Sequence, residues 1–254
     1  MAKLSYYYIN PTGNITLLVD SPVRAQDRGD IARRLMKAEP KAEQVGFICD
    51  KSLCMAGGEF CGNATLSAAA VYCLENGFEE ATVEMTVSGA QKPVRAEIKK
   101  TGFGEYSGRI EMPEPLKIEE VEFTLQGETI NAPAVFSEGI IHIIMPPVRN
   151  RDEYEKIIPE LCFNLNADSL GMMFIEGESL TPLVYTTVPG TAVWESSCAS
   201  GTTAAGVYLA SLNGGYFKGE FNEPGGELGI EICPGKKPIL SGTAKITARK
   251  SIDV

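Results

Sequence analysis

Short segments in which apolar and polar residues alternate make up most of this chain, and four longer segments have helical character. Residues 25–38 place Ile31, Leu35 and Ala38 at spacings of four and three, which predicts an amphipathic helix, and another is predicted near 150–162. Residues 62–76 and 199–213 are small or apolar nearly all round, as is typical of helices buried on every side. Strands are predicted at 4–9, 15–19, 44–49, 81–88, 93–99, 108–112, 121–125, 133–136, 139–145, 170–176, 182–187, 227–232 and 243–249.

The order of these elements repeats along the chain. Each half reads as strands, a helix, more strands, a buried helix and final strands, which indicates an internal duplication. Pro113, Pro115 and the acidic stretch 119–122 mark the midpoint, so we expect an N-terminal half at 1–118 and a C-terminal half at 119–254. In this division the last strand of the chain can also belong to the N-terminal half. The predicted class is α+β, with a curved, mostly antiparallel sheet around the central buried helix of each half.

A cysteine stands at the start of each buried helix. The first copy reads Cys61-Gly62-Asn63-Ala64-Thr65 and the second Cys198-Ala199-Ser200-Gly201-Thr202. Both have Thr at +4 and Ala at +7, and Asn-Gly closes both segments at +15 and +16. The N-terminus of a helix lowers the pKa of a thiol, and its unpaired amides suit a carboxylate. The repeat therefore predicts a symmetric site, in which one thiol removes a proton from a carbon and the other returns one from the opposite side.

Composition narrows the range of partners. The 254 residues are 44% hydrophobic and 22% charged, with a formal net charge of −10, as in an ordinary globular protein whose acidic surface repels nucleic acid. No apolar run approaches the ~20 residues that span a bilayer, and the N-terminus lacks the features of a signal peptide. Seven cysteines, an odd number, favour reduced thiols in the cytoplasm.

Neither a metal nor a cofactor is expected from the motifs. The chain has no Cys-x-x-Cys pair and only one histidine, which argues against a zinc site. Its glycine-rich segments match neither a P-loop nor a dinucleotide fingerprint. We find no sequence motif that would bind a nicotinamide, a nucleotide or pyridoxal phosphate.

The cysteine motifs carry a family resemblance. Glu59-Phe60-Cys61-Gly62-Asn63-Ala64 and the segment 194–202 resemble the two catalytic motifs of the diaminopimelate epimerase superfamily, the cofactor-independent amino-acid racemases. Asn10-Pro11-Thr12-Gly13-Asn14, the single histidine His142 and the turn at 224–226 resemble its other landmarks, in the family's order and over nearly the whole chain. The resemblance implies two pseudo-symmetric halves with the cysteines facing across a cleft, a small amino-acid substrate and a homodimer. Domain closure is expected because a carbanion-like state needs water excluded.

Within the superfamily the chain is most similar to histidine racemases of opine-metallophore pathways. The segments that carry this similarity are 10–16, 43–48, 59–65 and Gly171-Met172-Met173. Diaminopimelate epimerases have Glu-Arg before the second cysteine, and the Arg grips a distal carboxylate. Here Ser196 follows Glu195, which favours a neutral or basic substrate side chain.

The expected reaction is cofactor-independent racemisation, most simply of histidine, with Cys61 and Cys198 as the two bases. Alternatives that remain open are diaminopimelate epimerisation, a thiol redox sensor and a module that only binds an amino acid. The expected substrate-binding residues are Asn14, Gln44, Gly62, Asn63, His142, Glu195, Ala199, Ser200 and Gly201.

Overall fold

The structure is a computed structural model that describes residues 3–187 and 190–253. It divides into two compact units: unit 1 runs to Glu111 and resumes at Ile239, and unit 2 is Met112–Pro238. The sequence boundary at 118 lies inside a strand that pairs along its length within unit 2, so the division falls earlier in the structure. The last strand belongs to unit 1, because it pairs with the first and seventh strands.

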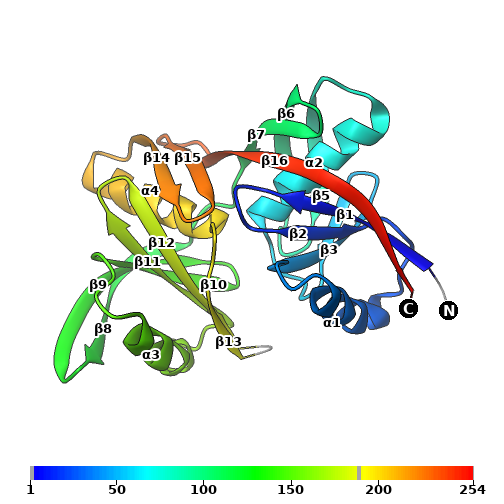
Figure 1. The fold of residues 1–254 in the computed structure, drawn as a ribbon. Helices are drawn as coiled ribbons and strands as arrows, with labels where there is room; N and C mark the ends of the chain where they lie inside the picture. The colour runs from blue at the N-terminus through cyan, green and yellow to red at the C-terminus, as the bar shows by residue number, and fades with distance from the viewer. Residues whose placement is uncertain (1–2, 188–189, 254) are drawn as a thin grey trace. The chain divides into compact units, whose positions relative to one another are not determined.

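Unit 1 is a closed ring of eight strands (Figure 1). Each strand pairs with the next in the order β1, β2, β3, β4, β5, β6, β7 and β16, and β16 closes the ring on β1. Two parallel pairs, β2–β3 and β4–β5, are bridged by the helices α1 and α2, and the other pairs are antiparallel. The elements are β1 (Lys3–Asn10), β2 (Thr16–Val19), the short helix η1 (Ala25–Asp27), α1 (Arg28–Ala38), β3 (Gln44–Cys49), β4 (Ser52–Met55), α2 (Gly62–Asn76), β5 (Glu80–Val87), β6 (Val94–Gly102), β7 (Glu105–Glu111) and β16 (Ile239–Asp253).

Unit 2 repeats this order of strands and crossovers. Its sheet runs β8, β9, β10, β11, β12, β14 and β15, with β13 paired to β12, and its parallel pairs β10–β11 and β12–β14 are bridged by α3 and α4. The helices α2 and α4 thus occupy equivalent places in their units. The elements are β8 (Lys117–Leu125), β9 (Glu128–Ser137), β10 (Ile140–Met145), α3 (Arg151–Asn164), β11 (Ser169–Glu176), β12 (Ser179–Thr186), β13 (Thr191–Trp194), α4 (Ala199–Leu212), β14 (Phe217–Glu223) and β15 (Gly226–Ile232).

The central strands of unit 2 are covered on both faces, with α3 on one side and α4 on the other (Figure 1). Successive side chains of a strand point to opposite faces. On β11, Leu170, Met172 and Phe174 therefore join the apolar cluster under α3, while Gly171 and Met173 lie on the α4 side. The continuous apolar run along this strand follows from burial on both faces.

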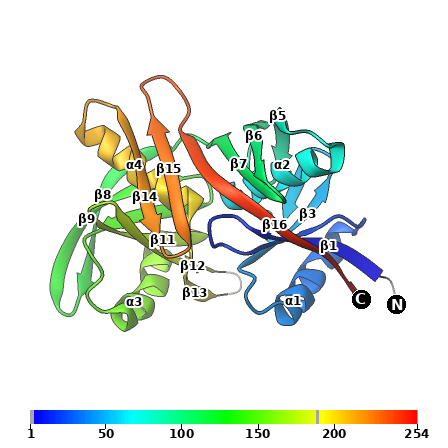
Figure 2. The ribbon, with the colours of Figure 1, turned by 45° about the horizontal axis from the view of Figure 1, so that its top comes forward.

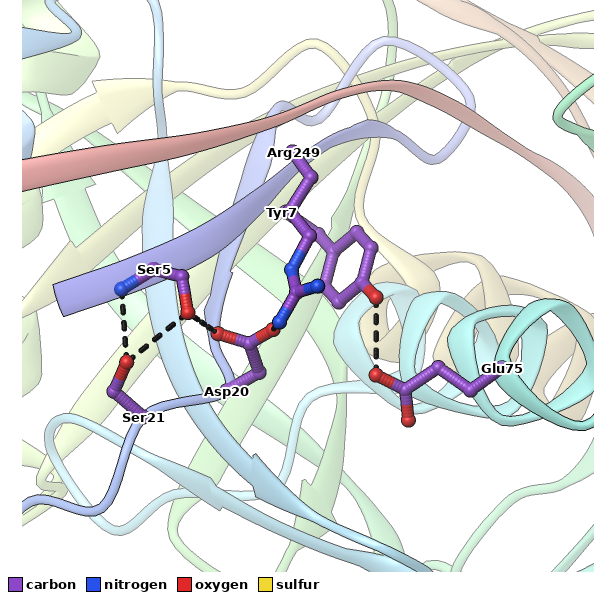
Figure 3. Close-up of polar contacts among 6 residues, drawn as sticks. All are labelled: Ser5, Tyr7, Asp20, Ser21, Glu75 and Arg249. Carbon is purple, nitrogen blue, oxygen red and sulfur yellow. Dashed lines mark hydrogen bonds and ion pairs between the residues drawn. The ribbon is translucent and has the colours of Figure 1, made fainter.

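A polar network fastens β16 onto unit 1 (Figure 3). Arg249 of β16 pairs with Asp20, whose other oxygen accepts a hydrogen bond from Ser5 of β1. The Arg249 guanidinium also lies 5.4 Å from the ring centre of Tyr7, whose hydroxyl donates to Glu75 of α2 at 3.0 Å. Figure 2 shows β16 running between β7 and β1. The network therefore couples the last strand to β1, to the end of β2 and to the buried helix.

All four predicted α-helices are present among the described residues, and the helix predicted at 62–76 has the observed bounds of α2. The predicted Asn-Gly ends are also present, since Gly77 and Gly214 adopt left-handed backbone conformations with φ of 68° and 63°. Three strands were not predicted, namely β4, β13 and β14. Two of them have four residues each, the shortest length at which an alternating pattern can be recognised.

Candidate active site

Each cysteine of the repeated motif occupies the residue just before its buried helix. Cys61 precedes α2 with φ −134° and ψ 116°, and Cys198 precedes α4 with φ −130° and ψ 100°. Both conformations are extended, as is normal for an N-cap residue, whose side chain can turn back over the first helical turn. The predicted repeat therefore extends to the backbone of the two thiol-bearing residues.

At the start of α2 the structure brings together three of the predicted residues. The Ala64 N–H donates to Cys61 Sγ at 3.4 Å, and the Cys61 thiol donates to Gln44 Oε1 at 2.9 Å. Gln44 Nε2 donates to Asn14 Oδ1, and Asn14 Nδ2 donates to Glu43 Oε2 at 2.7 Å. Asn14 and Gln44 thus form one hydrogen-bonded row that ends on the thiol.

The first turn of α2 is closely packed. Gly62 and Asn63 are its first two residues, and both are buried. Thr65, at +4 from Cys61, donates through its hydroxyl to the Cys61 carbonyl oxygen at 2.7 Å. This bond satisfies the carbonyl at the start of the helix without involving a charged group.

At the start of α4 the Cys198 thiol is joined to the single histidine through a serine. Cys198 Sγ lies 3.5 Å from Ser200 Oγ, which in turn lies 3.2 Å from His142 Nε2. His142 comes from β10 and is completely buried, and its Nδ1 has no hydrogen-bond partner among the residues described. Three predicted site residues therefore form one chain of contacts within unit 2.

Glycines on α4 and β11 lie where the surroundings of the Cys198 thiol and His142 are closely packed. A Cβ atom at Gly201 would lie 2.1 Å from Met173 Sδ and 3.2 Å from Cys198 Sγ. A Cβ atom at Gly171 would lie 2.7 Å from His142 Cδ2. Ala199 is also buried here. The glycines thus allow the thiol and the imidazole to sit where they do.

A buried carboxyl group, Glu223, was not among the predicted residues. It lies at the end of β14 and is 7% exposed. The Cys198 N–H donates to its Oε2 at 2.7 Å, and the Thr202 hydroxyl donates to its Oε1. The available signal was the alternate-residue row Phe217, Gly219, Phe221 and Glu223, in which the carboxyl falls on the inward face of the strand.

Burial dominates the ionisation of these groups. It raises the pKa of the Cys198 thiol well above its ordinary value, to which the charges of Glu195 and Glu223 add, while Ser200 and the Gly201 N–H act in the opposite sense. Burial also raises the pKa of Glu223 to about 8. His142 has its pKa lowered by burial to about 4, so its imidazole is neutral at pH 7.

The remaining predicted residue, Glu195, follows β13 directly, and its N–H donates to the Pro182 carbonyl oxygen at 3.1 Å. Its negative charge raises the pKa of the Cys198 thiol. Its neighbour Trp194 packs against Phe174 at 5.6 Å between ring centres, on the α3 side of the sheet. Trp194 is partly buried and packs against the core, one of the two roles that the sequence left open.

Neither a cluster of metal ligands nor a helix that could span a membrane is present in the part of the chain that the structure describes. Across 3–187 and 190–253, no group of three or more His, Cys, Asp or Glu side chains is arranged to hold a metal ion. No helix in the same ranges is both long and apolar enough to cross a bilayer. All seven cysteines lie in the described ranges, and all are free thiols.

Comparison with known sequences places these residues in a family context. The family model of the histidine racemase CntK N-terminal domain matches residues 3–249. A histidine racemase from Fusobacterium nucleatum is 34% identical over 217 residues, which are 81% of this chain and 80% of the relative. Another, from Staphylococcus aureus, is 29% identical over 216 residues, 78% of this chain and 77% of the relative.

Solved structures share the fold. A predicted epimerase from Pseudomonas aeruginosa matches with a TM-score of 0.71 at 13% identity and covers 99% of both chains. A probable proline racemase from Agrobacterium radiobacter matches with a TM-score of 0.70 at 15% identity, covering 99% of this chain and 93% of the other. At these identities the similarity shows a common fold, mostly sheet with a closed barrel.

Proposed function

The chain belongs to the histidine racemase family, and from this premise we propose that it interconverts L- and D-histidine with Cys61 and Cys198 as its two bases. The observation that carries the proposal is the matched setting of the two thiols, each on the N-cap residue of the buried helix of its own unit. The chain is an isomerase, as its relatives are.

In the proposed reaction one sulfur, as thiolate, removes the proton from the α-carbon of histidine. The electron pair of that C–H bond stays on the carbon and its carboxylate, and the other sulfur, as thiol, donates its proton to the opposite face. The first-turn amides of α2 and α4 would stabilise the carboxylate, as backbone donors at helix N-termini do. The amides proposed for this task are those of Gly62, Asn63, Ala199, Ser200 and Gly201.

The other proposed contacts concern the rest of the substrate. Asn14 and Gln44 would bind the α-amino group or the side chain, with Gln44 also orienting the Cys61 thiol that it already contacts. Glu195 would face the imidazole, since Ser196 offers no charge partner for a second carboxylate. Histidine is therefore the favoured substrate over diaminopimelate.

The resting protonation state follows from the electrostatics of unit 2. Because burial raises the pKa of the Cys198 thiol, and the charge of Glu195 adds to this effect, this residue starts the cycle as the proton donor. Cys61 then acts first as the base, and the roles are exchanged for the other enantiomer.

The two-base mechanism requires both thiols to reach one α-carbon from opposite sides. This is the diaminopimelate epimerase-like, pseudo-symmetric arrangement expected from the sequence, and it stays a prediction together with domain closure. A homodimer, a cytoplasmic location and supply of D-histidine to a metallophore pathway also remain predictions.

Solvent exchange at the α-carbon tests the mechanism. The protein is incubated with L-histidine in heavy water, and loss of the α-proton and of optical activity are followed together. Cys61→Ser and Cys198→Ser should each lower the rate by about 10²–10⁴-fold, the usual contribution of a general acid or base. The exposed Cys49 and the partly exposed Cys233 provide matched controls, and their Ser variants should keep the wild-type rate.

Each competing outcome identifies a different function. Racemisation at the wild-type rate in either catalytic-cysteine variant would exclude the paired-thiol mechanism. Saturable binding of histidine without exchange would indicate a binding module. Turnover of L,L-diaminopimelate in place of histidine would indicate the epimerase.

A further inference from the structure

The two units differ at one buried position beside the second cysteine. In both units a strand follows the buried helix and pairs in parallel with the strand that precedes it, β5 with β4 and β14 with β12. Each of these strands ends two residues before a glycine, Gly89 or Gly225, that lies against the segment just before the cysteine. The last strand residue is Val87 in unit 1 and Glu223 in unit 2, and both are buried.

The fold therefore accepts an apolar side chain at this position. Val87 is 3% exposed and has no ionisable group, whereas Glu223 is 7% exposed and carries one. Burying a carboxyl group costs free energy unless hydrogen bonds compensate for lost water. Because the equivalent position in unit 1 holds valine, this cost indicates that Glu223 has a role other than stabilising the fold.

The hydrogen bonds at the helix starts differ accordingly. In unit 1 the Thr65 hydroxyl donates to the Cys61 carbonyl oxygen. In unit 2 the equivalent Thr202 hydroxyl donates to Glu223, which also accepts the Cys198 N–H at 2.7 Å. Glu223 thus holds the backbone of the thiol-bearing residue directly.

We propose that Glu223 is a positioning residue that makes the two matched cysteines unequal, because its buried carboxyl group, which accepts the Cys198 N–H at 2.7 Å, opposes a negative charge on the Cys198 thiol once the carboxyl group ionises. The proposal rests on the role of Cys198 as a base. Two acidic groups close together in a buried site do not ionise independently. The Cys198 thiolate therefore forms more easily while Glu223 is protonated than after Glu223 has ionised.

The other groups around the pair strengthen this coupling. Glu195, after β13, contributes a further negative charge to both members of the pair. Ser200 of α4 contacts the thiol and His142 of β10 contacts Ser200, both as neutral groups. The pKa of Glu223, raised by burial to about 8, places its ionisation just above neutral pH. Below this value the thiolate of Cys198 can form beside a neutral carboxyl group, and above it the carboxylate opposes the thiolate.

The ultraviolet absorbance of the thiolate measures the coupling without any turnover. The pKa of Cys198 is obtained from the difference between each protein and the same protein carrying Cys198→Ser. Glu223→Gln should lower this pKa by about 1–3 units, the usual effect of removing a neighbouring like charge. Glu223→Val copies unit 1 and should lower it as well, which provides a second charge-free variant if the first folds poorly.

Two controls separate charge from structure. Glu220→Gln removes an exposed carboxyl group from the same strand and should leave the pKa of Cys198 unchanged. Thr202→Val removes a hydrogen bond and keeps the charge of Glu223, so it should not lower the pKa. A thiol that titrates at the same pH in wild-type protein and in both charge-free variants would overturn the proposal.

The pH dependence of histidine racemisation provides the second measurement. For a racemase the equilibrium constant is one, so kcat/KM is the same from either enantiomer at each pH. In the wild type kcat/KM should fall above about pH 8 as Glu223 ionises, and Glu223→Gln should lose this fall. If Glu223→Gln lowered kcat/KM by the same factor at every pH, the role of Glu223 would be structural only. Full activity in Cys198→Ser would instead reject the function proposed for Cys198, whatever the thiol titration shows.

Discussion

The ionisation of His142 makes a prediction that can be measured on one residue. It is the only histidine in the chain and is completely buried in β10. Burial lowers its pKa from 6.5 to about 4. In the unfolded chain the imidazole takes up a proton near pH 6.5, whereas in the folded chain it does so only near 4. Between these values the unfolded state binds more protons, so stability falls as the pH is lowered through this window.

The size of the effect follows from the shift. At about 1.36 kcal/mol per pKa unit, lowering the pKa of His142 from 6.5 to about 4 gives a loss of roughly 3 kcal/mol on acidification. This contribution is fully present above pH 6.5 and absent below about 4. Urea denaturation at a series of pH values should show it as a difference between the wild type and His142→Gln, which has no titratable group at this position. Taking the difference between the two proteins also cancels the effect of the carboxyl groups, because both proteins contain the same ones.

Proton NMR checks the cause directly, because a single histidine gives a single set of imidazole resonances. In the folded protein these resonances should not titrate until the pH approaches 4, and in the urea-unfolded chain they should titrate near 6.5. An imidazole that titrates near 6.5 while the protein is still folded would refute the reasoning. A difference between wild type and His142→Gln that does not change with pH would refute it as well.

Three further predictions concern stability and packing. Glu223→Gln should become more stable relative to the wild type as the pH rises from 4.5 to about 8, since the folded chain keeps a proton there that the unfolded chain has lost; urea denaturation across this range checks it. Gly201→Ala, whose Cβ would lie 2.1 Å from Met173 Sδ, should lower histidine racemisation about 100-fold with an unchanged circular dichroism spectrum. Arg249→Leu should lower the free energy of unfolding by about 1–3 kcal/mol, because it leaves Asp20 without its ion pair; chemical denaturation measures this, and no loss would contradict the role given to the network.

The elements that the sequence predicted best are those whose composition is typical of only one kind of secondary structure. The helix at 62–76 is small and apolar all round and ends in Asn-Gly, and its predicted and observed bounds agree. The strand at 44–49 agrees equally, since a short apolar run stands there between polar segments. The cysteine repeat was visible because both copies keep the same spacing to Thr, Ala and Asn-Gly.

The missed features depend on contacts between distant residues. The inward row of β14 contains a glycine and a charged residue, Gly219 and Glu223, so its alternation of apolar and polar residues is weak in the sequence. Glu223 lies 25 residues beyond Cys198, and only the parallel pairing of β14 with β12 brings it back to the start of α4. Local patterns contain no information on such a return, and a buried glutamate is rare enough to be disfavoured by composition alone.

The proposed mechanism needs one thiol and one thiolate at the same time, and the differences between the units bear on how that state arises. Two cysteines in equal surroundings would share the proton equally. Here Cys61 contacts the neutral amide of Gln44, whereas Cys198 lies near the carboxyl groups of Glu195 and Glu223. This inequality favours the proton on Cys198, but too large an inequality would slow the return to the other form, which the second enantiomer needs. A carboxyl group that is protonated at neutral pH adds no charge beside Cys198, so the enzyme forms with the proton on Cys198 and on Cys61 stay closer in free energy. The raised pKa of Glu223 therefore favours turnover in both directions.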